Sequence, residues 1–154
     1  MIRLLLTVAL AVPAHAQIVP GLEIPPSGNN QRASVSQQIG PVRLTIDYSS
    51  PAVHGPDGKD RRGQIWGKLV PYGLTELGFG NGTPAPWRAG ANENTVFAVS
   101  ENVSIEGKPL AAGRYGLHMI PGPEEWVLIF SKDSNAWDSF YYDPSADALR
   151  VSVK

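Results

Sequence analysis

A polar run at residues 87–95 (WRAGANENT) carries the side chains of this chain best suited to chemistry. The planar guanidinium of Arg88 is suited to holding an anionic or polar group. Asn92 can both donate and accept hydrogen bonds, and Glu93 can act as a general base or accept from a sugar hydroxyl. With Trp87 as an aromatic wall, this composition indicates a site for a small polar ligand or glycan.

An internal polar network is the alternative interpretation of the same run. The run leads directly into the apolar segment 96–99, and buried polar groups must find hydrogen-bond partners. In this interpretation Glu93 pairs with Arg88 or Arg62, and nothing is left for a ligand. The residue types alone are compatible with both.

Two more ligand-binding candidates precede this run. Arg61 and Arg62 are adjacent, and two neighbouring arginines can flank an anion, although such residues more often stack on a ring or pair with an acid. Tyr72, between Pro71 and Gly73, is a candidate pocket wall or a packed tyrosine whose hydroxyl bonds to the backbone. We select Arg62 and Tyr72 as binding residues.

His118 is the second candidate acid or base after Glu93. It lies in an expected strand at 114–120, where a histidine is more often packed than catalytic. His54 lies far away along the chain, so the spacing predicts no zinc site, and the absence of cysteine excludes thiol catalysis and iron–sulfur clusters. We expect neither a metal nor a cofactor.

A small secreted hydrolase acting on an ester or a glycoside is the alternative function. It would use Glu93, His118 or both as acid and base. The Gly-x-Ser-x-Gly, Ser-x-x-Lys and P-loop motifs are absent from the sequence. A glycosidase would also need a second carboxylate within about 5–9.5 Å of Glu93, for which Asp47 and Glu125 are the candidates.

The first sixteen residues have the pattern of a secretion signal. Arg3 precedes an apolar stretch at 4–12, and residues 14–16 (AHA) form a small-x-small cleavage site. The stretch is shorter than the roughly 20 residues of a membrane span. We therefore expect export to the periplasm or the extracellular space, with no membrane span in the mature chain.

Charge and composition argue against nucleic acid as a binding partner. The chain has 13 Lys+Arg against 14 Asp+Glu, and cleavage would remove Arg3, leaving 12 against 14 and a net charge of −2. A nearly neutral chain without a basic block is not expected to bind nucleic acid. Oligomeric state does not follow from these features.

The elements that must position these side chains are short strands separated by Gly and Pro turns. Alternation of apolar and polar residues is strict at 42–48, and further strands are expected at 33–39, 94–100, 103–105, 114–120, 126–131 and 149–153. A turn around Trp66 is the best short helical candidate. The expected core comprises Val42, Leu44, Ile46, Val96, Ala98, Leu117, Val127, Ile129 and Val151.

We predict an all-β protein with a single antiparallel β-sandwich over residues 32–154, after a signal peptide at 1–16 and an extended leader at 17–31. The long loop at 73–86 is expected to be either functional or disordered, and in the binding hypothesis it covers the site. Because the sequence stops on a strand, we also expect further C-terminal strands to be missing.

Several motifs in their order along the chain resemble the bacterial DUF2911 family. They are 48–51 (YSSP), 67–73 (GKLVPYG), 87–95 (WRAGANENT), 107–115 (GKPLAAGRY), 120–121 (IP) and Trp126. The resemblance implies an exported, all-β protein without an established activity. Family members usually have arginine where Ser50 stands and often a residue other than histidine at His118, and they typically continue past the last strand.

Overall fold

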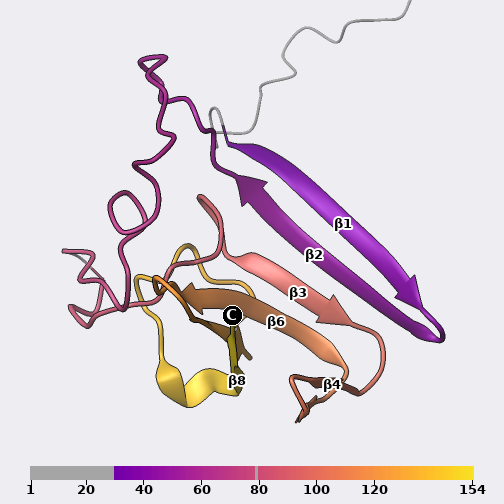
Figure 1. Ribbon diagram of the computed structural model, residues 1–154. Helices are drawn as coiled ribbons and strands as arrows, with labels where there is room; N and C mark the ends of the chain where they lie inside the picture. Colours follow the sequence, from indigo (N-terminus) through magenta and orange to yellow (C-terminus); the bar gives the residue numbers. More distant parts are fainter. Residues whose placement is uncertain (1–29, 79) are drawn as a thin grey trace, which may run out of the picture.

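The computed structural model describes residues 30–78 and 80–154, and its largest element is an antiparallel sheet of six strands. Their order across the sheet is β1-β2-β3-β6-β7-β8 (Figure 1). Their bounds are Gln31–Ile39, Val42–Ser50, Thr95–Val99, Gly113–Ile120, Trp126–Ser131 and Asp147–Val153. A second sheet pairs β4 (Val103–Ile105) with β5 (Lys108–Leu110). The predicted all-β, antiparallel fold class is confirmed.

Tight turns fix the register of the hairpins. Gly40 has φ +56° and is the first of two residues between paired Ile39 and Val42, which is where a type II′ hairpin places its glycine. Glu106 and Gly107 both have positive φ between β4 and β5, as a type I′ turn requires. The sequence analysis did not predict β5 as a strand. Its three residues include a lysine and a proline, so a single apolar residue, Leu110, is too little for a recognisable pattern.

The larger core lies on the face of the six-stranded sheet that the β4–β5 hairpin covers. Phe97 pairs across the strands with Tyr115, and Leu117 with Phe130, so side chains that alternate along each strand line up on one face. Buried members of this core are Phe97, Val99, Leu110, Tyr115, Leu117, Phe130, Leu149 and Val151. Leu110 brings β5 into the core, and Val103 and Ile105 of β4 pack against it.

A smaller core lies on the opposite face. Ile129 is fully buried there against Ala85 and Tyr142, which come from loops, with Val127 and Ile120 packed beside them. The expected single core therefore divides in two: Val42, Leu44, Ile46, Leu117 and Val151 belong to the larger core, and Val127 and Ile129 to the smaller one.

Two expected features differ from the structure. Ala98 is half-buried and in neither core, whereas its neighbours Phe97 and Val99 point into the larger core. An uninterrupted apolar run gives no alternation from which to choose the face. Turns, not a helix, surround Trp66, and a 3-10 helix, η1, lies instead at Pro144–Ala146 behind its N-cap residue Asp143.

The expected signal peptide at 1–16 and the leader up to residue 29 lie outside the described residues. Gln31, at the end of the expected leader, already belongs to β1. Among the helices of the described part, none is long and apolar enough to cross a membrane.

Candidate functional site

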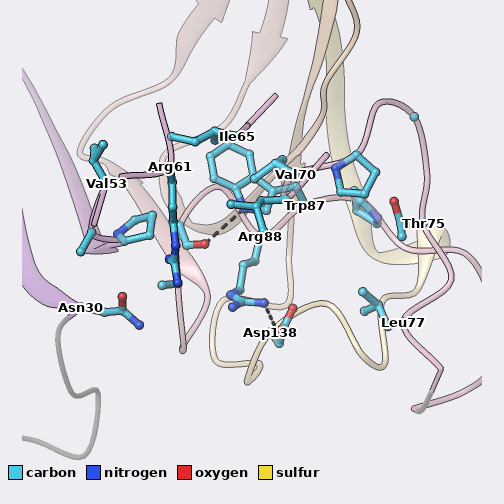
Figure 2. Close-up of a pocket in the computed structure, with 18 residues that line it drawn as sticks. Asn30, Val53, Arg61, Ile65, Val70, Thr75, Leu77, Trp87, Arg88 and Asp138 are labelled. Carbon is cyan, nitrogen blue, oxygen red and sulfur yellow. Dashed lines mark hydrogen bonds and ion pairs between the residues drawn. The ribbon is translucent and has the colours of Figure 1, made fainter. Parts of the chain in front are cut away.

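A pocket with a volume of about 400 Å³ lies beside the sheet, between the long β2–β3 connection and the loop after β7 (Figure 2). Its apolar walls include Val53, Ile65, Leu69, Val70, Leu77 and Trp87. Polar groups reach it from Asn30, Arg61, Thr75, Arg88 and Asp138. Gly73, Thr75, Leu77 and Pro86 come from the long loop at 73–86, which therefore forms one wall.

The backbone of the 87–92 segment is anchored to the sheet at both ends. Trp87 and Met119 exchange two backbone hydrogen bonds of 2.8 and 2.7 Å, and the Ala91 N–H donates to the Ser49 carbonyl at 2.9 Å. Ala89 and Asn92 have positive φ values of 57° and 59°, a conformation uncommon outside glycine. The polar run is thus a shaped loop held against β2 and β6.

Arg88 pairs with Asp138 across the pocket. The Arg88 guanidinium donates to Asp138 Oδ2, and Asp138 Oδ1 accepts from the Ser139 backbone N–H at 2.6 Å. Asp138 is 6% exposed and has φ 64°. Arg88 Nε is buried and has no hydrogen-bond partner in the described part of the chain. The polar-network interpretation predicted that Arg88 pairs with Glu93, but its acid partner is Asp138, 50 residues away in the sequence.

The two adjacent arginines of the preceding loop have different environments. Arg62, the predicted binding residue, is exposed and bridges to Asp60 at 2.5 Å, and its hydrogen bond lowers the pKa of Asp60. It does not line the pocket, whereas Arg61 does. Figure 2 shows the Arg61 and Arg88 side chains extending in the same direction, toward the side where Asn30 and Asp138 lie.

Trp87, a predicted binding residue, lines the pocket and belongs to a cluster of three indoles. Its Nε1 donates to the Gly90 carbonyl at 3.2 Å, and its ring meets those of Trp66 and Trp126 edge-on at centroid distances of 5.5 and 6.3 Å. Trp66 is 48% exposed, so the cluster extends from the pocket to the surface.

Tyr72 does not line the pocket, although Pro71 and Gly73 on either side of it do. Its ring lies against Gly67, where an added Cβ would come within 2.7 Å of a ring carbon. Gly67 therefore permits the contact, and Tyr72 itself is 45% exposed.

Asn92 and Glu93 lie behind the pocket rather than in its lining. Asn92 Oδ1 accepts from the amide of Asn30, which does line the pocket, at 3.1 Å, while Asn92 Nδ2 is buried without a partner among the described residues. Glu93 Oε2 accepts from the hydroxyl of buried Ser49 at 3.2 Å. Neither Arg88 nor Arg62 pairs with Glu93 in the ion pairs of the described chain.

His118 lies on the smaller-core face of β6 and is 3% exposed. Its Nδ1 is 2.9 Å from Ser139 Oγ, and its ring meets Tyr142 edge-on at 5.2 Å. Burial lowers the pKa of His118 to about 4, although Asp147, Asp133 and Asp138 raise it. At neutral pH the imidazole is therefore uncharged. No hydrogen bond of the described residues joins it to Glu93.

Arg61 and Asp138 are the pocket residues whose importance the sequence pattern did not reveal. Nothing in the sequence distinguishes Arg61 from Arg62, because an irregular loop has no period that assigns an inward face. Asp138 reaches Arg88 through tertiary structure alone. No group of three or more His, Cys, Asp or Glu residues is placed to hold a metal ion within the described ranges.

Fold and site together define an antiparallel all-β protein with an arginine-containing pocket beside its sheet. The chain belongs to the DUF2911 family, described as "Protein of unknown function", whose family model matches residues 30–154. No curated protein matches the sequence, and no solved structure matches it either.

Proposed function

We propose that this protein is an exported binding protein that holds a small polar ligand or glycan in the pocket between Arg61, Arg88 and Trp87. The supporting observation is the cavity itself. Its volume of about 400 Å³ lies in the range of roughly 300–1,000 Å³ that is usual for small-ligand pockets. Apolar walls with a few polar groups are likewise the common composition of such sites.

Placement of the candidate residues favours binding over hydrolysis. Trp87 and Arg88 line the pocket, whereas Glu93 and His118 do not. A buried histidine with a pKa near 4 and a glutamate behind the wall have no direct contact with a molecule in this cavity. The hydrolase alternative therefore receives no support from these contacts.

A pocket-filling variant tests the proposed site. Val53 lines the pocket and is 42% exposed, so Val53→Trp should occupy the cavity without disturbing a buried core. Val35→Trp is the matched control, because Val35 is 55% exposed on β1 and lies outside the pocket. The measurement is a thermal-shift screen of sugars and small organic acids, followed by calorimetry on each compound that binds.

We expect compounds that raise the Tm of the wild-type protein and of Val35→Trp but not that of Val53→Trp, because a ligand that binds the native state stabilises it. Compounds that bind Val53→Trp as tightly as wild type would place binding elsewhere. A screen without any binding compound would reject the proposal.

Export is supported by the arginine, apolar stretch and small-x-small site within residues 1–16. Expression of the full chain in a bacterium, with fractionation and N-terminal sequencing, tests it. We expect a periplasmic or extracellular product that begins at Gln17. A cytoplasmic product that retains Arg3 would contradict export.

A further inference from the structure

We propose that the ligand of this pocket is a small monocarboxylate with a compact apolar body, and that Arg61 binds its carboxylate. This inference rests on the proposed function, because it names the ligand class of the same pocket. Three features carry it: a guanidinium without a hydrogen bond to any described residue, a surplus of one positive charge among the lining residues, and apolar walls.

Arg61 is the arginine whose guanidinium is left for a ligand. It is half-buried at the pocket wall, and within the described chain its side chain forms no ion pair and no hydrogen bond. The nearby carboxylate of Asp57 forms its ion pair with Lys59 at 3.1 Å, and the Lys59 hydrogen bonds, together with a smaller effect of the Arg61 charge, lower the pKa of Asp57. Because the Arg61 guanidinium is attracted by Asp57 but makes no hydrogen bond to it, a ligand carboxylate that accepts directly from the guanidinium gains binding energy.

Hydrogen bonds fix the backbone of the loop that carries Arg61. The Arg61 N–H donates to the Val53 carbonyl and the Gln64 N–H to the Arg61 carbonyl, both at 2.9 Å. An added Cβ on Gly55 would lie 2.6 Å from Asp57 Oδ1 and 3.0 Å from one terminal nitrogen of Arg61. The absence of a side chain at Gly55 therefore lets the guanidinium lie close against the loop, and a positioned guanidinium loses less entropy on binding.

The charges of the pocket favour a single negative charge on the ligand. Two arginines and one aspartate line it among the described residues, and Arg88 uses the aspartate, Asp138. One positive charge remains, and the Arg88 Nε donor is also unpaired. A carboxylate matches one guanidinium with two parallel hydrogen bonds, whereas a phosphate monoester brings nearly two charges.

The apolar walls set the character of the remainder of the ligand. Ile65, Leu69, Val70, Leu77 and Trp87 offer apolar surface that an apolar part of the ligand would remove from water. A volume of about 400 Å³ is large enough for a compact ring or a branched alkyl group. A ring or branched alkyl group attached to a carboxylate meets both conditions.

Calorimetry with phenylacetate on the mature chain tests the inference, and phenylacetamide and phenyl phosphate serve as the neutral and more highly charged comparisons. We expect phenylacetate to bind more tightly than either. Arg61→Gln should weaken its binding by about tenfold or more, since a charge-assisted bond contributes roughly 1.5–3 kcal/mol. Arg62→Gln is the matched control, because Arg62 bridges to Asp60 outside the pocket, and it should leave the affinity unchanged.

The outcomes are separable from those of the proposed function. Equal binding of acid and amide, tighter binding of the phosphate, or an unchanged affinity in Arg61→Gln would each overturn the carboxylate inference. Should Arg61→Gln fail to fold by circular dichroism, Arg61→Lys, which keeps the charge but not the bidentate fork, must also weaken binding. A neutral compound that Val53→Trp blocks and Arg61→Gln does not would uphold the pocket and reject the carboxylate.

Discussion

The two faces of the six-stranded sheet are packed in different ways. One face carries aliphatic and aromatic side chains, with Phe97 and Phe130 edge-on at 5.1 Å, and the β4–β5 hairpin covers it. The other face holds a smaller apolar cluster together with His118, and irregular loops that contribute Ala85 and Tyr142 cover it.

The hairpin-covered face mainly contributes stability, whereas the loop-covered face depends on specific polar contacts. On the hairpin-covered face, burial of apolar surface stabilises the fold, and this stabilisation does not depend on exact partners. The loop-covered face contains polar groups that must meet particular partners, such as His118 with Ser139 at 2.9 Å. Asp138, next to Ser139, points instead to Arg88 at the pocket. A substitution of a polar residue on the loop-covered side should therefore affect the pocket more than one on the hairpin-covered side.

The largest predicted effect is on the hairpin-covered face. Phe130→Ala removes a 3%-exposed ring from the larger core and should lower the free energy of unfolding by about 3–5 kcal/mol. Urea denaturation followed by circular dichroism measures it. Val35→Ala, at a side chain 55% exposed, should change the value by less than about 0.5 kcal/mol. Comparable losses in the two variants would mean that this face is not the main core.

A smaller effect on the loop-covered face should depend on pH. Because the pKa of His118 falls from 6.5 to about 4 on burial, the unfolded chain binds a proton that the native state does not between these values. The unfolding free energy should therefore fall as the pH falls from about 6.5 to 4, by at most about 3 kcal/mol, and be unaffected by this group above that window.

Denaturation curves across this pH range compare wild type with two variants. His118→Gln should show a flatter pH dependence, while His54→Gln, at an exposed loop residue, should keep the wild-type slope. If the slope survives in His118→Gln, other groups cause it and the assignment to the loop-covered face is wrong.

The smallest predicted effect is at the edge of the loop-covered face. The Tyr142 hydroxyl donates to Asp147 at 2.7 Å and accepts from Arg150 at 2.6 Å, and burial together with the bond to Asp147 raises the pKa of Tyr142. Tyr142→Phe should cost about 0.5–1.5 kcal/mol in thermal or urea unfolding. Tyr141→Phe provides the comparison, because Tyr141 is 75% exposed and should be neutral. Equal unfolding free energies for the two variants would mean that the Tyr142 hydroxyl does not stabilise the fold.

The strands were predictable because their signal is local. Alternation at 42–48 and the Gly and Pro turns identify most of the sheet without knowledge of its partners. The apolar run 96–99 identifies a strand but not which residues face the larger core. Val96 and Ala98 were therefore expected in the core, whereas Phe97 and Val99 belong to the larger core and Val96 is buried outside it. The sequence thus predicts where a strand lies more readily than which of its side chains face the core.

The pocket was predictable in part for the same reason. Trp87 and Arg88 belong to one dense polar run and could be selected from it. Arg61 and Asp138 could not, because one lies in an aperiodic loop beside an equivalent arginine and the other meets Arg88 from 50 residues away. Polar composition marks a region of interest, but the tertiary contacts decide which of its side chains face the cavity.

The position of Trp87 makes intrinsic tryptophan fluorescence a probe of the pocket. The Trp87 indole forms a wall of the cavity and touches two further tryptophans, so a molecule that binds there is expected to change the fluorescence of Trp87. Trp137, which is 57% exposed, supplies a solvent-facing reference. Ligand titrations of the unlabelled protein can therefore be followed by the intensity and emission maximum of its tryptophan fluorescence.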